Sequence, residues 1–99
     1  MGFKTLVSTN GTKVTDDFSR QARKVGLEVQ ISIDGHTPEL NDMYRGKGTF
    51  KKAISGVKTL VKHRVYTIMS MVCFDKNFIH LEDFFRLAHS LNGNRSRVF

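Results

Sequence analysis

The sequence predicts an α/β fold built on a parallel sheet, and three observations indicate it. Val29-Gln30-Ile31-Ser32-Ile33 alternates apolar and polar residues, which is typical of a strand with two unlike faces. Apolar residues between Phe50 and Val61 recur at the spacing of an amphipathic helix. Strand-like and helix-like segments also alternate along all 99 residues. Such alternation implies parallel strands joined by right-handed crossovers, with helices covering one face of the sheet.

The predicted elements follow in the order β-α-β-α-β-α. The strands are expected at residues 3–8, 27–33 and 65–72, and Val98-Phe99 can begin a further strand. The first helix is capped by Thr15 and stopped by Gly26, the second is capped by Thr49, and the third covers residues 81–91. Residues 34–49 are predicted to be a loop, which is long for a βα connection and therefore functional or mobile.

Composition limits the function without identifying it. The net charge is +7 and the pI is about 9.9, but the basic residues lie on water-facing helix sides or, as with Arg95 and Arg97, in the tail, so we predict no nucleic-acid partner. No apolar run is long enough to span a membrane. The single cysteine excludes an internal disulfide, so a reducing cytoplasm is the expected location. Residues 1–99 are expected to form one domain.

Polar side chains follow each predicted strand. In a parallel sheet all βα loops lie at one end, where ligands bind, so the loop residues there are expected to converge: Asn10, Asp34, Arg45 and Cys73. The face away from the helices carries Glu28, Gln30 and Ser32. This face suits the interior of an incomplete barrel that holds a polar ligand, and it suits a water-exposed sheet equally well.

Five motifs occur together in one order: Ser8-Thr9-Asn10-Gly11-Thr12, Val29 to Gly35, Thr37 to Gly46, Gly48-Thr49-Phe50, and Met71 to Asn77. In this order they resemble the middle of radical S-adenosylmethionine (radical SAM) enzymes. The likeness is to the peptide-modifying branch, which includes the pyrroloquinoline quinone (PQQ) synthesis protein E and the anaerobic sulfatase-maturing enzymes. The resemblance implies a TIM-like partial (β/α)6 barrel, of which this chain would be strands three to five of six.

The resemblance also implies a cofactor site. The parent protein would use S-adenosylmethionine and a [4Fe-4S] cluster, and Ser32 and Arg45 would meet the carboxylate of S-adenosylmethionine. Asp34 would orient loop or substrate groups, or cap its own turn, and Asn10 would line the pocket or simply form a turn. No catalytic residue and no metal ligand is predicted in this chain. Departures from the family pattern are the missing CxxxCxxC and Gly-Gly-Glu/Asp segments, Asn41 in place of histidine, and Ser70 in place of asparagine.

Two hypotheses follow. In the first, the chain is the central piece of a longer radical SAM enzyme that acts on a peptide or a small-molecule precursor, and it is inactive alone because Cys73 cannot hold a cluster. In the second, it is a self-standing basic α/β module that binds an anionic ligand or partner. Unpaired sheet edges make self-association plausible in either case. The histidines indicate no metal site, because His80 and His89 fall on opposite helix faces and His36 has no evident partner.

Overall fold

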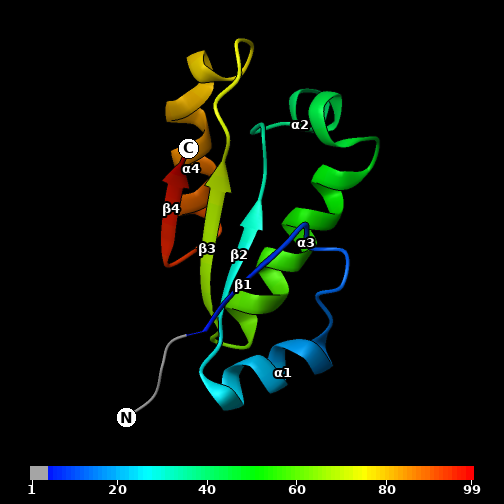
Figure 1. Ribbon diagram of the computed structural model, residues 1–99, viewed down its shortest axis with the longest axis vertical. Coiled ribbons are helices and arrows are strands. Elements are labelled where there is room, and N and C mark those ends of the chain that lie inside the picture. Colours follow the sequence, from blue (N-terminus) through cyan, green and yellow to red (C-terminus); the bar gives the residue numbers. More distant parts are fainter. Residues whose placement is uncertain (1–4) are drawn as a thin grey trace.

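The computed structural model describes residues 5–99, which form a parallel sheet flanked by helices (Figure 1). The strands lie in the order β1-β2-β3-β4 and have the bounds β1 Leu6–Thr9, β2 Glu28–Ser32, β3 Tyr66–Met71 and β4 Arg95–Val98. The α/β class and the parallel sheet are confirmed. The expected start of the first strand, at residues 3 and 4, lies outside the described part of the chain. The further strand begins at Arg95, earlier than Val98-Phe99 suggested.

The helices are α1 Asp16–Val25, α2 Pro38–Arg45, α3 Thr49–Lys62 and α4 Leu81–Ser90, with a 3-10 turn, η1 Phe78–His80, before α4. The predicted limits of α1 are confirmed. The Thr15 hydroxyl accepts a hydrogen bond from the Phe18 N–H at 3.0 Å. Gly26 follows the helix in the left-handed conformation, with φ of 72°.

The prediction of an unbroken loop at residues 34–49 is wrong, because this segment contains α2. The Thr37 hydroxyl accepts from the Leu40 N–H at 3.3 Å, and Pro38 occupies the start of the helix, where its missing N–H costs nothing. The prediction that Thr49 caps the next helix is also wrong by one position, since Gly48 is the N-cap of α3 and provides no side-chain hydrogen bond.

The core lies between the sheet and the helices. Val29, Ile31 and Ile33 are fully buried and pack against a cluster that includes Leu60 of α3 and Phe84 of α4. The α3 helix touches β2, β3, α1 and α2, and it is therefore the central helix of this layer. Burial at this scale stabilises the fold by about 1.5–3 kcal/mol for each large apolar side chain.

The other face of the sheet is mainly polar, although Leu6, Tyr66 and Ile68 also lie on it. Glu28, Gln30 and Ser32 are only half-buried on this face. The strand register places Arg95 beside Ile68 and Arg97 beside Ser70, which in turn pair with Gln30 and Ser32. Neighbours in a parallel register point to the same side, so both arginines project from this polar face. The prediction that Arg95 and Arg97 belong to a tail is therefore wrong.

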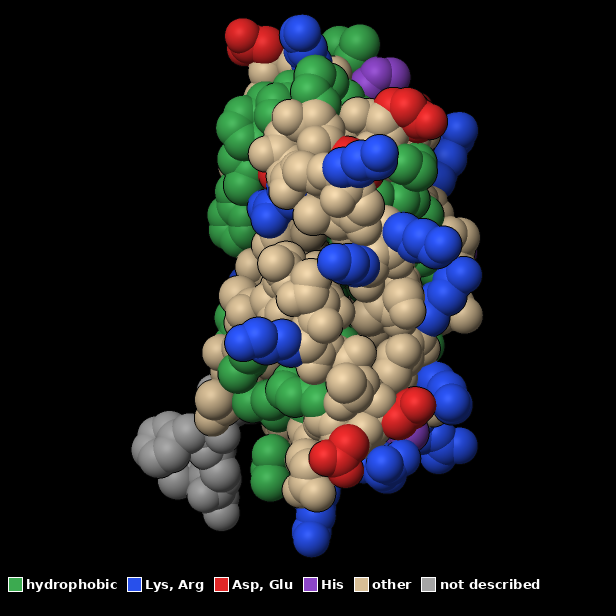
Figure 2. All heavy atoms as spheres, turned by 90° about the vertical axis from the view of Figure 1, so that its right-hand side faces the viewer, with side chains coloured by type: hydrophobic (Ala, Val, Ile, Leu, Met, Phe, Trp, Pro, Cys, Tyr) green, Lys and Arg blue, Asp and Glu red, His purple; other side chains and the backbone are tan. Residues whose placement is uncertain are grey.

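The surface carries its positive charge in a dispersed form. Figure 2 shows lysine and arginine side chains spread over one side of the molecule, separated by polar and apolar groups. Lys51, Lys52, Lys58 and Lys62 of α3 are all exposed, as predicted. Within residues 5–99, no helix has the length and apolar character needed to cross a membrane.

Candidate functional site

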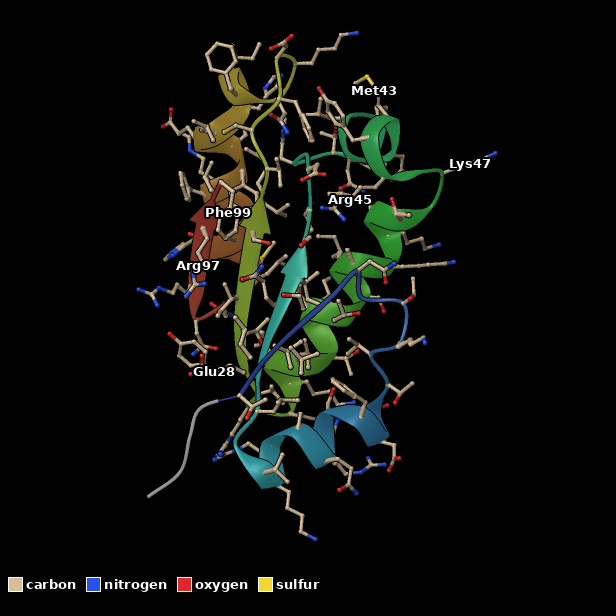
Figure 3. All side chains as sticks on the ribbon, in the orientation of Figure 1. Glu28, Met43, Arg45, Lys47, Arg97 and Phe99 are labelled. Carbon is tan, nitrogen blue, oxygen red and sulfur yellow. The ribbon has the colours of Figure 1, made fainter. Side chains whose placement is uncertain are left out.

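A hollow of about 370 Å³ lies at the carboxyl ends of the strands. Its lining residues come from the first two βα connections, the end of β2, helix α2 and the start of α3: Asn10, Ser32, Asp34, Tyr44, Arg45 and Thr49. Figure 3 shows Arg45 near the end of β2, whereas Glu28 marks the opposite end of the same strand. The four residues predicted for the site therefore line one hollow: Asn10, Ser32, Asp34 and Arg45.

Arg45 is held by a buried carboxylate. Its Nε donates to Oδ2 of Asp34 at 2.7 Å, and the Asp34 side chain is only 5% exposed. The other oxygen of Asp34 accepts from the Val72 N–H at 3.1 Å. Asp34 thus orients Arg45 and the end of β3. Among the described residues, no hydrogen bond occupies the terminal nitrogens of Arg45, so that end of the guanidinium can bind an anion in the hollow.

Ser32 forms a hydroxyl pair with Ser70. The two Oγ atoms lie 3.1 Å apart, and either can be the donor. The residues are register partners on β2 and β3. Because each hydroxyl is both donor and acceptor, Ser32 can accept from Ser70 and donate its own proton to a ligand. Ser70 thus supplies a polar contact at the position where the family pattern has asparagine.

Asn10 has both of the roles considered for it. Its Oδ1 accepts from the N–H of Thr12 at 3.0 Å and from the Thr12 hydroxyl at 2.7 Å, which is a turn closed by its own side chain. The same residue lines the hollow. The turn therefore fixes Asn10 at the rim of the hollow.

Two buried asparagines hold the backbone of Asp34, and neither was predicted to matter. Oδ1 of Asn41 accepts from the Asp34 N–H at 2.8 Å. Nδ2 of Asn77 donates to the carbonyl oxygens of Asp34 and Val72, both at 2.9 Å, while its Oδ1 accepts from the Phe74 N–H at 2.6 Å. Both asparagines are at most 1% exposed. The sequence signal was present, since both belong to the motifs quoted above.

Asp42 connects α2 to α3. Its carboxylate accepts from the N–H of Gly48 at 2.8 Å and of Phe50 at 2.9 Å, which caps α3 in place of a Thr49 side chain. Partial burial raises the pKa of Asp42, but hydrogen bonds from Asn41, Phe50, Gly48 and Thr49 outweigh this effect and bring the pKa below its usual value of 3.8. The carboxylate is therefore ionised at neutral pH.

Cys73 lies outside this hollow, so the expected convergence of four loop residues holds for three of them. Cys73 lines a neighbouring hollow of about 470 Å³ together with Met43 and Phe74. Tyr44 borders both hollows and stacks on Phe74, with ring centroids 4.4 Å apart and planes inclined by 18°. Nothing in the sequence singles out Tyr44, because one aromatic residue in a polar segment belongs to no periodic pattern.

Two larger hollows lie away from these groups. One of about 500 Å³ surrounds Arg64 and Tyr66 at the amino ends of the strands, and one of about 550 Å³ lies beside α3 near Ile54. We assign the site to the smaller hollow because an oriented guanidinium and a hydroxyl converge there. Parallel α/β sheets also bind their ligands at the carboxyl ends of the strands.

Comparison with known proteins shows the family to which the chain belongs. The family model described as "Radical SAM superfamily" matches residues 1–88. An AdoMet-dependent heme synthase of Oleidesulfovibrio alaskensis is 30% identical over 101 residues, covering 100% of this chain and 26% of that protein. The mycofactocin maturase MftC of Mycobacterium tuberculosis is 36% identical over 83 residues, covering 82% of this chain and 21% of that protein. The chain thus spans about a quarter of the length of these curated relatives.

Solved structures share the fold. Native anSMEcpe with bound AdoMet and the Kp18Cys peptide superposes with a TM-score of 0.84 at 17% identity. The match covers 97% of this chain and 27% of that one.

A third sequence relative, a cysteine-type anaerobic sulfatase-maturating enzyme of Clostridium novyi, is 35% identical over 71 residues, covering 67% of this chain and 19% of that protein.

Proposed function

This chain belongs to the radical SAM superfamily, and from that premise we propose that its hollow binds the carboxylate end of S-adenosylmethionine. The superfamily implies S-adenosylmethionine and a [4Fe-4S] cluster as cofactors. Arg45 would pair with the carboxylate, Ser32 would donate to it, Asp34 would hold Arg45 in place, and Asn10 would line the rim. No residue of this chain is assigned a bond-breaking step.

The observation that carries the proposal is the arrangement around Arg45. A planar guanidinium whose Nε is bonded to a buried aspartate has its remaining donors pre-oriented, so little side-chain entropy is lost when an anion binds. Ser32 adds an O–H donor from the end of β2 in the same hollow. A carboxylate with two oxygen acceptors satisfies both groups.

The cluster does not fit this chain by itself. A [4Fe-4S] cluster is held by several cysteine thiolates, and the sequence has one cysteine, Cys73. We therefore propose that the chain acts as part of a longer enzyme whose other segments bind the cluster, and that the 99 residues alone are catalytically silent. If they are strands three to five of the barrel, as the motifs imply, β4 would be the sixth. The single cysteine supports a reducing cytoplasm as the location.

For the substrate we propose a peptide. Two of the similar proteins are named as maturases, and one of the similar solved structures holds a peptide with AdoMet. In the parent enzyme, reductive cleavage of S-adenosylmethionine at the cluster would start radical chemistry on that peptide. A cofactor precursor, as in PQQ synthesis, remains a prediction from the sequence motifs.

Calorimetry with S-adenosylmethionine on the cluster-loaded full-length enzyme tests the site. Arg45→Ala should weaken binding by about tenfold to a hundredfold, because charge-assisted hydrogen bonds contribute about 1.5–3 kcal/mol. Asp34→Asn should weaken it less, since the guanidinium stays but loses its ionic partner. Arg20→Ala, an exposed arginine on α1, serves as the control and should change nothing.

Unchanged affinity in Arg45→Ala would remove the assignment of the site. Iron-dependent cleavage of S-adenosylmethionine by the isolated 99-residue chain would contradict the proposal that this chain is silent. Binding of inorganic phosphate that is insensitive to Arg45→Ala would instead favour the alternative of a self-standing module for anionic ligands.

A further inference from the structure

Three side chains with metal-binding atoms meet above the sheet, although the sequence separates them widely. His36 lies in the connection between β2 and α2, His80 ends η1, and Asp83 lies in the first turn of α4. One donor atom from each lies within 4.8 Å of the others. The Asp83 Oδ2 atom is 3.3 Å from Nδ1 of His80 and 3.8 Å from Nε2 of His36. The sequence prediction of no partner for His36 is therefore wrong.

We propose that His36, His80 and Asp83 form a binding site for a divalent transition metal, with Zn²⁺ as its first candidate. Two imidazoles and one carboxylate are a ligand set that such ions accept, with a water molecule completing the coordination. Nothing in the radical SAM activity requires this ion, and the site lies on residues other than those that line the hollow of Arg45.

The geometry is close to that of a tetrahedral ion. Bond lengths of 2.0–2.1 Å place neighbouring ligand atoms of a tetrahedron about 3.3 Å apart. The His80–Asp83 pair already has this separation, and the His36–Asp83 pair is longer by a distance that a small rotation of the imidazole covers. The two imidazole rings lie with their centroids 4.9 Å apart and their planes tilted by 39°, so His36 and His80 are in direct contact beside Asp83.

Solvent access and hydrogen bonding both permit binding. The side chains of His36, His80 and Asp83 are 27%, 37% and 42% exposed, which leaves a path for the ion and for a water ligand. Nδ1 of His36 is buried and has no hydrogen-bond partner among the described residues. No hydrogen bond at that nitrogen fixes the tautomer, and Nε2 must give up any proton it carries when a metal binds. The missing partner also lowers the expected affinity about 10–100-fold below that of a fully supported site.

Such an ion would join two parts of the structure. His36 follows the Asp34-Gly35 turn beside the hollow, whereas Asp83 belongs to α4. In the described residues, His36 contacts His80 of η1 and Asp83 of α4 directly. Metal binding would therefore fasten the β2–α2 connection to α4 and stabilise the folded chain.

The test uses the 99-residue chain without a histidine tag, titrated at neutral pH with Zn²⁺ in a calorimeter and with Co²⁺ in a spectrophotometer. We expect one site per chain, micromolar affinity, and visible Co²⁺ absorption of tetrahedral type. His36→Ala, His80→Ala and Asp83→Asn should each weaken binding at least tenfold. The control variant His89→Ala removes an exposed histidine from α4, the helix that carries Asp83, and should leave the affinity for Zn²⁺ unchanged.

Circular dichroism checks that each variant is folded. Zn²⁺ should raise the melting temperature of the unsubstituted chain and of His89→Ala more than that of the three site variants. Absence of binding at millimolar Zn²⁺ would overturn the proposal. Binding that survives all three substitutions would overturn it equally, because the ion would then lie elsewhere. S-adenosylmethionine takes no part in these measurements, so their outcome is independent of the proposed function.

Discussion

Replacing Asn77 by alanine should destabilise the fold severely, although this residue contacts no predicted ligand. Asn77 is fully buried, and its side chain makes three hydrogen bonds, to the Phe74 N–H and to the carbonyl oxygens of Asp34 and Val72. An alanine leaves these backbone groups without that partner. Each buried polar group that loses its hydrogen bond costs about 1–3 kcal/mol. Only the hydrogen bond to Asp34 is fully buried and the other two are part-buried, so we expect the lower part of the summed range, about 3–5 kcal/mol of the free energy of unfolding.

This loss is a large fraction of the total, because domains of this size are stable by about 5–15 kcal/mol. Urea unfolding followed by circular dichroism measures it directly, provided that the slope with denaturant stays constant between variants. In thermal unfolding the same change should lower the melting temperature by at least about 12 °C. Gln21→Ala, at an exposed position of α1, is the control and should stay within about 0.5 kcal/mol.

Asn77→Asp separates hydrogen bonding from size. The aspartate has the same shape and keeps an acceptor for the Phe74 N–H, but it loses both donors and places a negative charge against two carbonyl oxygens. It should be destabilised as strongly as the alanine variant at neutral pH, and less in acid, where a protonated carboxyl regains one donor. A loss below about 1 kcal/mol in either variant would refute this account of Asn77.

Three further predictions concern other parts of the chain. Gly11→Ala should lower the free energy of unfolding in urea by about 2–4 kcal/mol, because φ is 91° and the new Cβ would lie 2.8 Å from the Ala53 Cα. The control Gly26→Ala, with φ of 72° and open space around it, should cost only about 1 kcal/mol. Equal losses would contradict the steric argument. Asp42→Asn should lower the melting temperature at pH 7, and the difference from the unsubstituted chain should shrink as the pH falls below 3.8. A carboxyl whose pKa is lowered in the folded state stabilises the fold above its unfolded pKa and stops doing so when it is protonated. A difference independent of pH would exclude this linkage. The outer strands β1 and β4 leave unpaired edges, so gel filtration should show self-association that grows with concentration, and a monomer at every concentration would count against it.

Local patterns were sufficient to predict most of the elements. The alternation at Val29, Ile31 and Ile33 identified β2 and its buried face, because one side of that strand packs on helices. The period between Phe50 and Val61 identified α3. Thr15 and Gly26 marked the ends of α1. The Thr15 hydroxyl accepts a backbone N–H of the first turn, and Gly26, which has no side chain, adopts the left-handed conformation that ends the helix.

Sequence reasoning failed where neighbours in space decide the structure. The α2 helix has only eight residues and its one buried residue, Asn41, is polar, so its Gly-rich and Pro-containing surroundings concealed it. Two arginines among four residues are untypical of a strand, so the sequence predicts a tail at Arg95 and Arg97. Pairing with β3 nevertheless makes them part of β4. His36 and His80 could not be joined by any spacing rule, since their contact depends on how the β2–α2 connection meets η1.

The buried backbone groups at the end of β2 explain how the site is built. Where β2 stops, the N–H and C=O groups of Asp34 leave the ladder but remain buried, and both need partners. An amide side chain can accept with one atom and donate with the other, so Asn41 satisfies the N–H while Asn77 satisfies the C=O. With its backbone held from both sides, the Asp34 carboxylate can fix Arg45 in one orientation. Asparagine at position 41, in place of the family's histidine, therefore suits the backbone contact that it makes here.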